Sequence, residues 1–361
     1  CKKTRGLILE KFKSFIAEEE KEQPYKLIIF NHSAEMVRDV KDTSLGELIK
    51  LLNDSAKKVD IEIYNVDFVG LYVSEKNGKK FLNSFPFDDN GDVILPDQSD
   101  RLEKQYQSPI EINKENTILM PRGMGTVDFT SSMNWIDTIK GLELDGFLTI
   151  PSVKTWEICS SKYLTDKICR KNGLRTPKTV AISYSEDTER AMSELGNKFP
   201  VILKTSTGSQ TGVGVTIQES FRSLHSSVQM LKLYRKYLSL LVQEYIKTDY
   251  DVRVVILDNQ ILGSMKRKVI SGDIRSNASL GAETETIELT ELEKEDSIKA
   301  AQSVEGRLVG VDFIPSKNKE KEKPYILEVN SMPGFGGIEK IQKGLTAEIL
   351  KHFKNRKNWR L

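Results

Sequence analysis

The sequence predicts a protein of the α/β and α+β classes, with a small α/β domain followed by a larger α+β region. The chain has 361 residues, which is enough for two or three domains with separate cores. Near its start, short apolar strands flank an amphipathic helix, a pattern typical of α/β units. Near its end, residues 309–314 and 325–330 are two apolar strands that each carry a carboxylate.

The first part of the chain divides into an extension and a small domain. Apolar residues at helical spacing predict an N-terminal helical extension over residues 1–24, which we expect to dock on the body or on a partner. Short buried strands are predicted at 26–30 and 61–66, and the helix between them predicts that they pair in parallel. The polar stretch 83–109 is expected to be a long loop or hairpin. We therefore predict a small α/β domain over residues 25–150.

The second part, residues 151–361, is predicted to form a two-lobed domain. A single helix is expected from about 152 to 172, stopped by Gly173, because glycine is the usual residue after a helix C-terminus. Strands, turns and a further helix then predict a lid lobe at about 175–245 and a C-terminal lobe at about 246–350.

Lys204 is the informative residue of the strand at 201–204. A lysine inside an apolar strand needs an anion beside it, and a phosphate and an internal carboxylate are both open for that role. The loop that follows, residues 207–215, is rich in glycine but lacks the Gly-Lys-Ser/Thr ending of a P-loop. Its glycines are compatible with a flap that covers phosphates and with an ordinary hairpin turn.

The two strands near the end of the chain predict a metal site. Residues two apart on a strand point to the same face, so Glu328 and Asn330 should project together, with Leu327 and Val329 on the opposite face. If the strand at 309–314 pairs with this one, Asp312 joins them. Such an oxygen set is typical of Mg²⁺ held together with nucleotide phosphates. The alternatives are a surface position and a carboxylate that pairs with a nearby Lys or Arg.

A basic segment is the third candidate feature. Residues 265–268 and 275–277 place cationic and amide groups at one end of a hairpin that turns at Asp258 and Asn259. Such groups can clamp a phosphoryl group or stabilise an oxyanion. A solvated basic face is the alternative, and the spacing is compatible with both.

Composition excludes some classes of protein. The net charge of +2 gives no overall positive field for nucleic acid. No apolar run reaches the length of about 20 residues that spans a bilayer, so no membrane partner is expected. The three cysteines, Cys1, Cys159 and Cys169, lack a metal-site spacing and suit a reducing compartment, which predicts a cytoplasmic protein.

The order of these motifs resembles the ATP-grasp superfamily, and within it the RimK-type glutamate ligases. The resemblance is clear from about Lys162 to Ile338 and weaker over the first domain, where residues 121–125 resemble the segment that closes the family's pre-ATP-grasp domain. The residues that carry it are Lys204, Gly208-Ser209-Gln210, Gln243-Glu244-Tyr245-Ile246, Asp251-Val252-Arg253, Met265-Lys266-Arg267, Arg275-Ser276-Asn277, Asp312 and Glu328-Val329-Asn330.

The resemblance implies a role for each of these positions. ATP would be bound by Lys162, Lys204, Gly208, Ser209, Gln210, Gln243, Glu244, Tyr245, Ile246 and Asp251, with Asp251 near the ribose. Asp312, Glu328 and Asn330 would hold two Mg²⁺ ions, which Mn²⁺ could replace. Arg267 would face the transferred phosphoryl group as the catalytic residue. Arg253, Arg275, Ser276 and Asn277 would line the phosphate and acceptor site.

The resemblance also implies an activity. It is an ATP-dependent carboxylate–amine ligase that forms an amide through an acyl phosphate, adding glutamate or another amino acid to the carboxylate of a protein tail, a peptide or a small molecule. The alternatives are a small-molecule dipeptide ligase of the same fold, an ATP-grasp phosphotransferase and an inactive nucleotide-binding protein. Family members are often dimers or tetramers, which leaves a homo-oligomer open. Two departures are Thr211, which lengthens the glycine loop, and Leu280-Gly281-Ala282 in place of a basic residue before paired glycines. The second leaves the identity of the added amino acid open.

Overall fold

The structure is a computed structural model that describes most of the chain. Its described residues are 24–31, 43–68, 70–86, 107–122, 129–207, 214–236, 238–269, 284–334 and 336–359. The helix predicted within residues 1–24 lies outside this set, as do most of the glycine loop and all of 275–277. No helix within the described ranges is long and apolar enough to cross a bilayer.

The first sheet is parallel and buried on both faces. Its strand β1 pairs in parallel with β2, as the strand–helix–strand pattern predicts. Leu27 and Ile29 of β1 pack into one apolar cluster, and Ile28 and Phe30 pack into another on the opposite face, which explains why β1 reads as a continuous apolar run. The order is β2-β1-β6-β7. The elements are β1 (Tyr25–Asn31), α2 (Thr43–Val59), β2 (Ile61–Asp67), β6 (Thr117–Pro121), α3 (Phe129–Leu144) and β7 (Leu148–Thr149).

A small antiparallel sheet, β3-β4-β5, lies beside it. The hairpin between its first two strands turns at Asn77 and Gly78, both of which have a positive φ. An Asn-Gly pair between strands is a strong hairpin signal, but the charged residues around it concealed these strands from sequence analysis. Residues 87–106 of the predicted loop lie outside the described ranges. The strands are β3 (Tyr72–Lys76), β4 (Lys79–Asn83) and β5 (Ile110–Ile112).

Two helices replace the single helix predicted over 152–172, so that prediction is wrong. Ser161 ends the first helix and caps the second, where its side chain accepts a hydrogen bond from the backbone N–H of Leu164. Serine favours such cap positions because its side chain satisfies an unpaired helix N–H. Gly173 follows the second helix with a φ of 72°, so the predicted stop is confirmed. The helices are α4 (Val153–Ser160) and α5 (Lys162–Lys171).

The third sheet is antiparallel, with the order β10-β9-β11-β8. One face packs on two helices through an apolar cluster that includes Leu203, Leu224 and Val242. Its elements are β8 (Thr179–Ile182), α6 (Asp187–Glu194), β9 (Val201–Thr205), β10 (Val215–Gln218), α7 (Phe221–Tyr234) and β11 (Leu240–Glu244).

The fourth sheet is antiparallel and has five strands in the order β14-β13-β12-β15-β16. The predicted hairpin turn at Asp258 is confirmed, and Asp258 itself has a φ of 50°. The elements are β12 (Tyr250–Leu257), β13 (Gln260–Lys268), β14 (Thr284–Thr286), α8 (Glu291–Ser303), β15 (Leu308–Ile314), β16 (Tyr325–Asn330), α9 (Gly336–Ile341), α10 (Leu345–Lys354) and a 3-10 turn (Arg356–Trp359).

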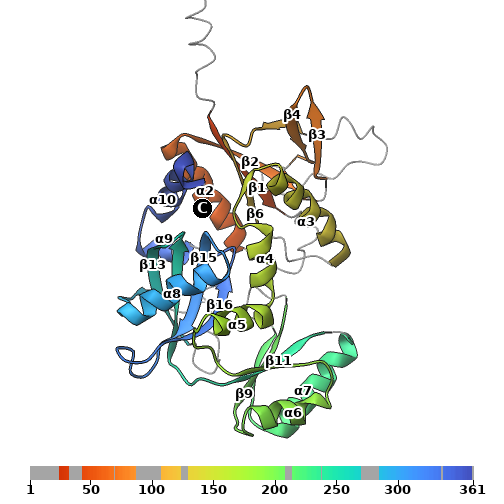
Figure 1. Cartoon of the computed structure of the whole chain (residues 1–361), viewed down its shortest axis with the longest axis vertical. Coiled ribbons are helices and arrows are strands. Elements are labelled where there is room, and N and C mark those ends of the chain that lie inside the picture. Colours follow the sequence, from red (N-terminus) through yellow and green to blue (C-terminus); the bar gives the residue numbers. More distant parts are fainter. Residues whose placement is uncertain are drawn as a thin grey trace, which may run out of the picture.

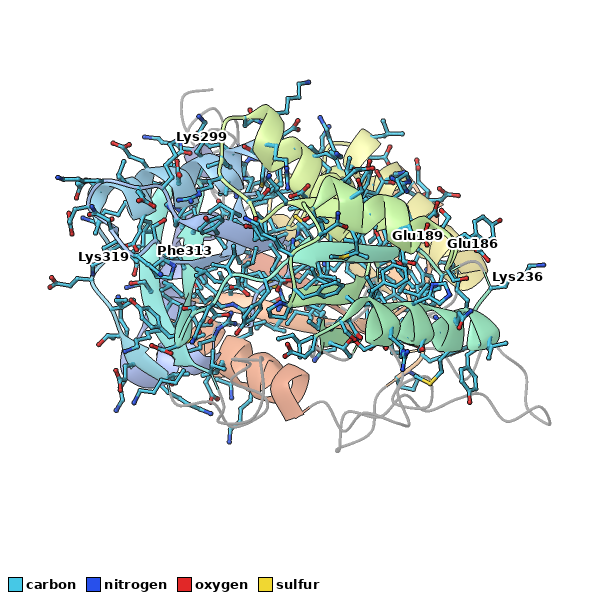
Figure 2. All side chains as sticks on the ribbon, turned by 90° about the horizontal axis from the view of Figure 1, so that it is seen from below. Glu186, Glu189, Lys236, Lys299, Phe313 and Lys319 are labelled. Carbon is cyan, nitrogen blue, oxygen red and sulfur yellow. The ribbon has the colours of Figure 1, made fainter. Side chains whose placement is uncertain are left out.

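The sheets follow one another along the long axis of the molecule (Figure 1). The parallel sheet lies at one end, the five-stranded sheet in the middle and the sheet with α6 and α7 at the other end. Helix α10 packs on α2 in one shared apolar cluster, so the end of the chain ties the first sheet to the five-stranded sheet. Seen from below, Phe313 and Lys299 mark the five-stranded part, and Glu186 and Lys236 mark the part with α6 and α7 (Figure 2).

Candidate active site

A row of charged side chains crosses three strands of the five-stranded sheet. Arg253 on β12 lies opposite Asp312 on β15, and Asp312 lies opposite Glu328 on β16. Residues directly opposite in an antiparallel pair share a face, so the three side chains project together. Asn330 joins them, because its Nδ2 donates a hydrogen bond to Oε1 of Glu328 at 3.1 Å. The predicted grouping of Asp312, Glu328 and Asn330 is therefore present in the structure.

The opposite face of these strands is apolar. Val252, Val311 and Val329 are fully or almost fully buried there. A register shift between Asp312 and Phe313 places Phe313 opposite Ile326, which leaves Leu327 as an extra residue. The prediction that Leu327 shares the buried face with Val329 is therefore wrong, since Ile326 takes that place. Such bulges often redirect a side chain beside a site, and this one directly precedes Glu328.

Asp312 is held by two arginines. Arg253 binds it through two hydrogen bonds of 2.7 and 2.6 Å, and Nη2 of Arg267 adds one of 3.0 Å. Arg267 also forms a two-bond ion pair with Asp251 at 2.7 and 2.6 Å. Burial alone would raise the pKa of Asp312, but the charges of Arg253 and Arg267 outweigh it and hold this pKa at about 2. Asp312 is therefore a carboxylate at neutral pH.

The two arginines differ in exposure. The Arg267 side chain is 3 % exposed and that of Arg253 is 18 % exposed. Burial alone would lower the pKa of Arg267, but the charges of Asp312 and Asp251 outweigh this effect and raise the pKa above its usual value. The guanidinium therefore stays charged. This placement favours Arg253 as the group that faces a ligand and favours a supporting role for Arg267 and Asp251. The phosphoryl contact of Arg267 and the ribose contact of Asp251 stay predictions.

Gly310 is a residue that sequence analysis missed. It lies opposite Asn330, and a Cβ on it would stand 3.0 Å from Cβ of Pro333 and 3.9 Å from Nε of Arg253. Its missing side chain thus lets Pro333, in the turn after β16, lie directly against this strand. A glycine among β-branched strand residues is a signal for such a close approach.

Lys204 lies on β9 of the neighbouring sheet and is 8 % exposed. Its Nζ donates a hydrogen bond of 2.9 Å to Oε1 of Gln243, so within the described ranges an amide oxygen accepts from it. Burial lowers the pKa of Lys204 to about 8, with Glu328 opposing and Lys162 reinforcing that shift. Lys204 is still mostly protonated at neutral pH, and its depressed pKa means that an incoming anion would stabilise its charged form.

The break at Ser161 positions Lys162. The backbone N–H of Lys162 donates to the carbonyl of Ser206 at 2.9 Å, which holds the start of α5 against the end of β9. A lysine at the positive end of a helix is unfavourable by itself, whereas an anion is favoured there. The two predicted phosphate lysines thus come from a helix start and a strand end that are hydrogen-bonded to each other.

The predicted ATP-binding residues 243–246 lie at the end of β11, of which Gln243 and Glu244 are the last two residues. Gln243 is buried, and its Nε2 donates to Oγ1 of Thr179 at 2.7 Å. Glu244 is exposed, and its carboxylate accepts from the backbone N–H of Lys178 at 3.2 Å. Tyr245 and Ile246 follow, both half-buried. The remaining predicted site residues, Gly208, Ser209, Gln210, Arg275, Ser276 and Asn277, lie outside the described residues.

The oxygen set suits a hard cation only together with other ligands. In the described ranges, no three His, Cys, Asp or Glu side chains gather where they could hold a metal ion. Asp312, Glu328 and Asn330 supply two carboxylates and an amide on one face, which fits Mg²⁺ when phosphate oxygens and water complete the shell. The set therefore fits a metal that arrives with a nucleotide.

Comparison with known proteins gives the family and the fold of the chain. A model of the RimK-like ATP-grasp domain matches residues 159–353. The coenzyme γ-F420-2:α-L-glutamate ligase of Methanocaldococcus jannaschii is 31 % identical over 215 residues, which are 58 % of this chain and 70 % of the relative. A probable α-L-glutamate ligase of Coxiella burnetii is 30 % identical over 217 residues, 60 % of this chain and 69 % of the relative.

The solved structures extend the likeness to the fold of nearly the whole chain. The ATP-grasp ligase PsnB, in complex with a minimal precursor, Mg and ADP, superposes with a TM-score of 0.59 at 16 % identity, covering 92 % of this chain and 98 % of that one. The fold is that of the ATP-grasp ligases. The chain belongs to the RimK-like ATP-grasp family, whose α-L-glutamate ligases are carbon–nitrogen ligases.

Proposed function

We propose that this protein is an ATP-dependent carboxylate–amine ligase that adds glutamate, or another amino acid, to the carboxylate of a protein or peptide. The observation that carries the proposal is the row of Arg253, Asp312, Glu328 and Asn330 on one sheet face, close enough to Lys204 for Glu328 to affect its charge. The names of the relatives favour glutamate, and a second PsnB structure, in complex with the precursor peptide PsnA2 and AMPPNP, supports a peptide acceptor.

In this proposal the site aligns the γ-phosphate of ATP with a carboxylate. Lys162 and Lys204 bind phosphate oxygens, and the strand end from Gln243 to Ile246 binds the adenine. Arg253 faces the transferred group, held in place by Asp312. Arg267 also donates to Asp312 and is itself paired with Asp251. Asp312, Glu328 and Asn330 would hold Mg²⁺, which neutralises charge on the phosphates when it is bound.

The reaction needs no nucleophilic protein side chain. An oxygen of the acceptor carboxylate attacks the γ-phosphorus, the bond to the bridging oxygen breaks and ADP leaves. The amine of the incoming amino acid then attacks the carbonyl carbon of the acyl phosphate. Inorganic phosphate leaves, the nitrogen loses a proton and an amide remains. Positioning and charge stabilisation by Arg253 and the lysines are the contributions of this chain.

The test is a substrate panel with a product assay. Purified protein, ATP and Mg²⁺ are incubated with each amino acid, with and without peptides that carry free carboxylates, and phosphate release is measured. We expect release that depends on one amino acid and a condensed product by mass spectrometry. A phosphorylated product without an amide would support the phosphotransferase. A dipeptide formed without a peptide acceptor would support the small-molecule ligase.

Lys204 predicts how nucleotide affinity depends on pH. Its pKa is about 8 in the free protein, and a bound phosphate raises it because the anion stabilises the charged form. The protonated form binds better, so the affinity for ADP should be steady below pH 8 and fall above it, by at most about tenfold per pH unit. Isothermal titration calorimetry between pH 7 and pH 9.5 measures this.

Two variants give the comparison. Lys204→Met should bind ADP weakly with little dependence on pH. Lys198→Met removes an exposed lysine ahead of the same strand and should keep the wild-type profile. A wild-type affinity that does not change across this range would contradict the assignment of Lys204 to the phosphates.

A further inference from the structure

Arg122 is a buried arginine between the parallel sheet and the candidate active site. It directly follows β6, and its backbone N–H donates to the carbonyl of Phe30 at 2.9 Å, so its main chain is fixed to β1. Its side chain reaches the turn that follows β16. Nη2 donates to the carbonyl of Pro333 at 3.0 Å and approaches that of Met332 at 3.5 Å.

The environment of Arg122 is unusual for a guanidinium. The residue is 5 % exposed. Burial lowers its pKa to about 10, so it remains charged at neutral pH. Among the described residues, its side chain donates to the backbone carbonyls of Pro333 and Met332, and hydrogen bonds from a charged donor are stronger than neutral ones. A buried charge held by the carbonyls of one turn fixes that turn in one place, because releasing it would leave the charge without acceptors.

The turn that Arg122 holds continues into the candidate metal ligands. Asn330 is the last residue of β16, and Pro333 comes three residues later. Pro333 packs against the bare backbone of Gly310, since a Cβ there would be 3.0 Å from Cβ of Pro333. Gly310 lies opposite Asn330, whose amide donates to Glu328. A continuous set of contacts therefore runs from Arg122 through the turn to Asn330 and Glu328.

We propose that Arg122 is a positioning residue through which the parallel sheet sets the orientation of Asn330 and Glu328 toward a nucleotide-bound Mg²⁺. This inference rests on the proposed function, because it takes those two residues as metal ligands. Under this proposal the parallel sheet helps to shape the nucleotide site, whether or not it also binds the acceptor.

The chain offers a matched control in Lys354. Its Nζ donates to the carbonyls of Val59 at 2.8 Å and Asp60 at 3.1 Å. Like Arg122, it is a cation that donates to two backbone carbonyls across the junction with the first domain, and its Nζ also lies 3.4 Å from Oδ2 of Asp60. It lies at the α2–α10 contact, and its contacts do not involve the turn after β16. Loss of Lys354 should therefore weaken the junction without disturbing Asn330.

The experiment compares Arg122→Met, Arg122→Lys and Lys354→Met with the wild type. Calorimetry measures the dissociation constant of ADP with excess Mg²⁺ and with EDTA, and the melting temperature is recorded for each protein. For Arg122→Met we expect a Mg²⁺-dependent gain in ADP affinity that is smaller by about tenfold or more, the size of effect seen when a residue that orients a metal ligand is lost. The affinity in EDTA should change little, and Arg122→Lys should keep part of the gain. Lys354→Met should keep all of it.

The inference fails if Arg122→Met retains the wild-type gain, or if Lys354→Met loses as much. If Arg122→Met does not fold, Arg122→Lys decides: a gain equal to that of the wild type overturns the inference, and a reduced gain with a normal melting temperature supports it. A wild-type protein that binds no ADP under either condition would instead overturn the proposed function. The two failures are therefore distinguishable.

Discussion

Glu328→Gln should lower amino-acid-dependent phosphate release by about 10²- to 10³-fold, because it removes a carboxylate from the set proposed to hold the metal and the phosphates. Glutamine keeps the size of the side chain and an oxygen that can still accept the hydrogen bond from Asn330. The variant therefore removes the charge of residue 328 and keeps its hydrogen bond with Asn330. Initial rates of phosphate release at saturating ATP measure the effect.

Glu322→Gln is the control for this variant. Glu322 lies on the exposed loop ahead of the same strand, where it pairs with Arg175 at 3.2 Å. Its side chain is 53 % exposed, so neutralising it should leave the rate close to that of the wild type. If Glu328→Gln turned over ATP as fast as Glu322→Gln, the proposed metal set would be wrong.

Arg267→Met should destabilise the protein by about 3–5 kcal/mol, the usual cost when one partner of a buried ion pair is removed. Arg267 binds both Asp251 and Asp312, and the side chains of these aspartates are 10 % and 5 % exposed. Without the guanidinium, Asp251 loses both hydrogen bonds of that ion pair and Asp312 loses one of its two described arginine partners. Chemical denaturation gives the free energy of unfolding directly.

Arg190→Met provides the contrast. Arg190 also forms a close ion pair, with Glu194 at 2.7 Å, but both side chains are about half exposed. Water replaces such a partner easily, so this substitution should leave the midpoint of denaturation nearly unchanged. Equal stability of the two variants would contradict the view that Arg267 supports the site by holding a buried charge network.

The residues of the candidate site show which of its features can be predicted from the sequence. Glu328 and Asn330 were found because a strand repeats every two residues, and one strand contains both. The ion pair of Arg253 with Asp312 depends on the register between strands 59 residues apart, which no local pattern encodes. The sequence therefore indicated carboxylates for a metal but not the two arginines that hold one of them.

Two other differences between the predicted and the observed structure, at Ser161 and at Leu327, have local causes. The helix break at Ser161 was missed because serine is tolerated inside helices, and only the contact of Lys162 with Ser206 shows why a second helix begins there. The bulge at Leu327 was missed because alternation alone assumes an unbroken register. Arg122 was noticed only as part of a family segment, since its role depends on a turn 211 residues away.

The most direct test of the account is transfer of oxygen from the acceptor to phosphate. The acceptor that gives a condensed product is labelled with ¹⁸O in its carboxylate, and the phosphate released is analysed by mass spectrometry. An acyl phosphate intermediate predicts that each phosphate carries one oxygen from the carboxylate and that ADP is the nucleotide product. Unlabelled phosphate, or AMP with pyrophosphate, would contradict the proposal that this site phosphorylates a carboxylate before the amine attacks.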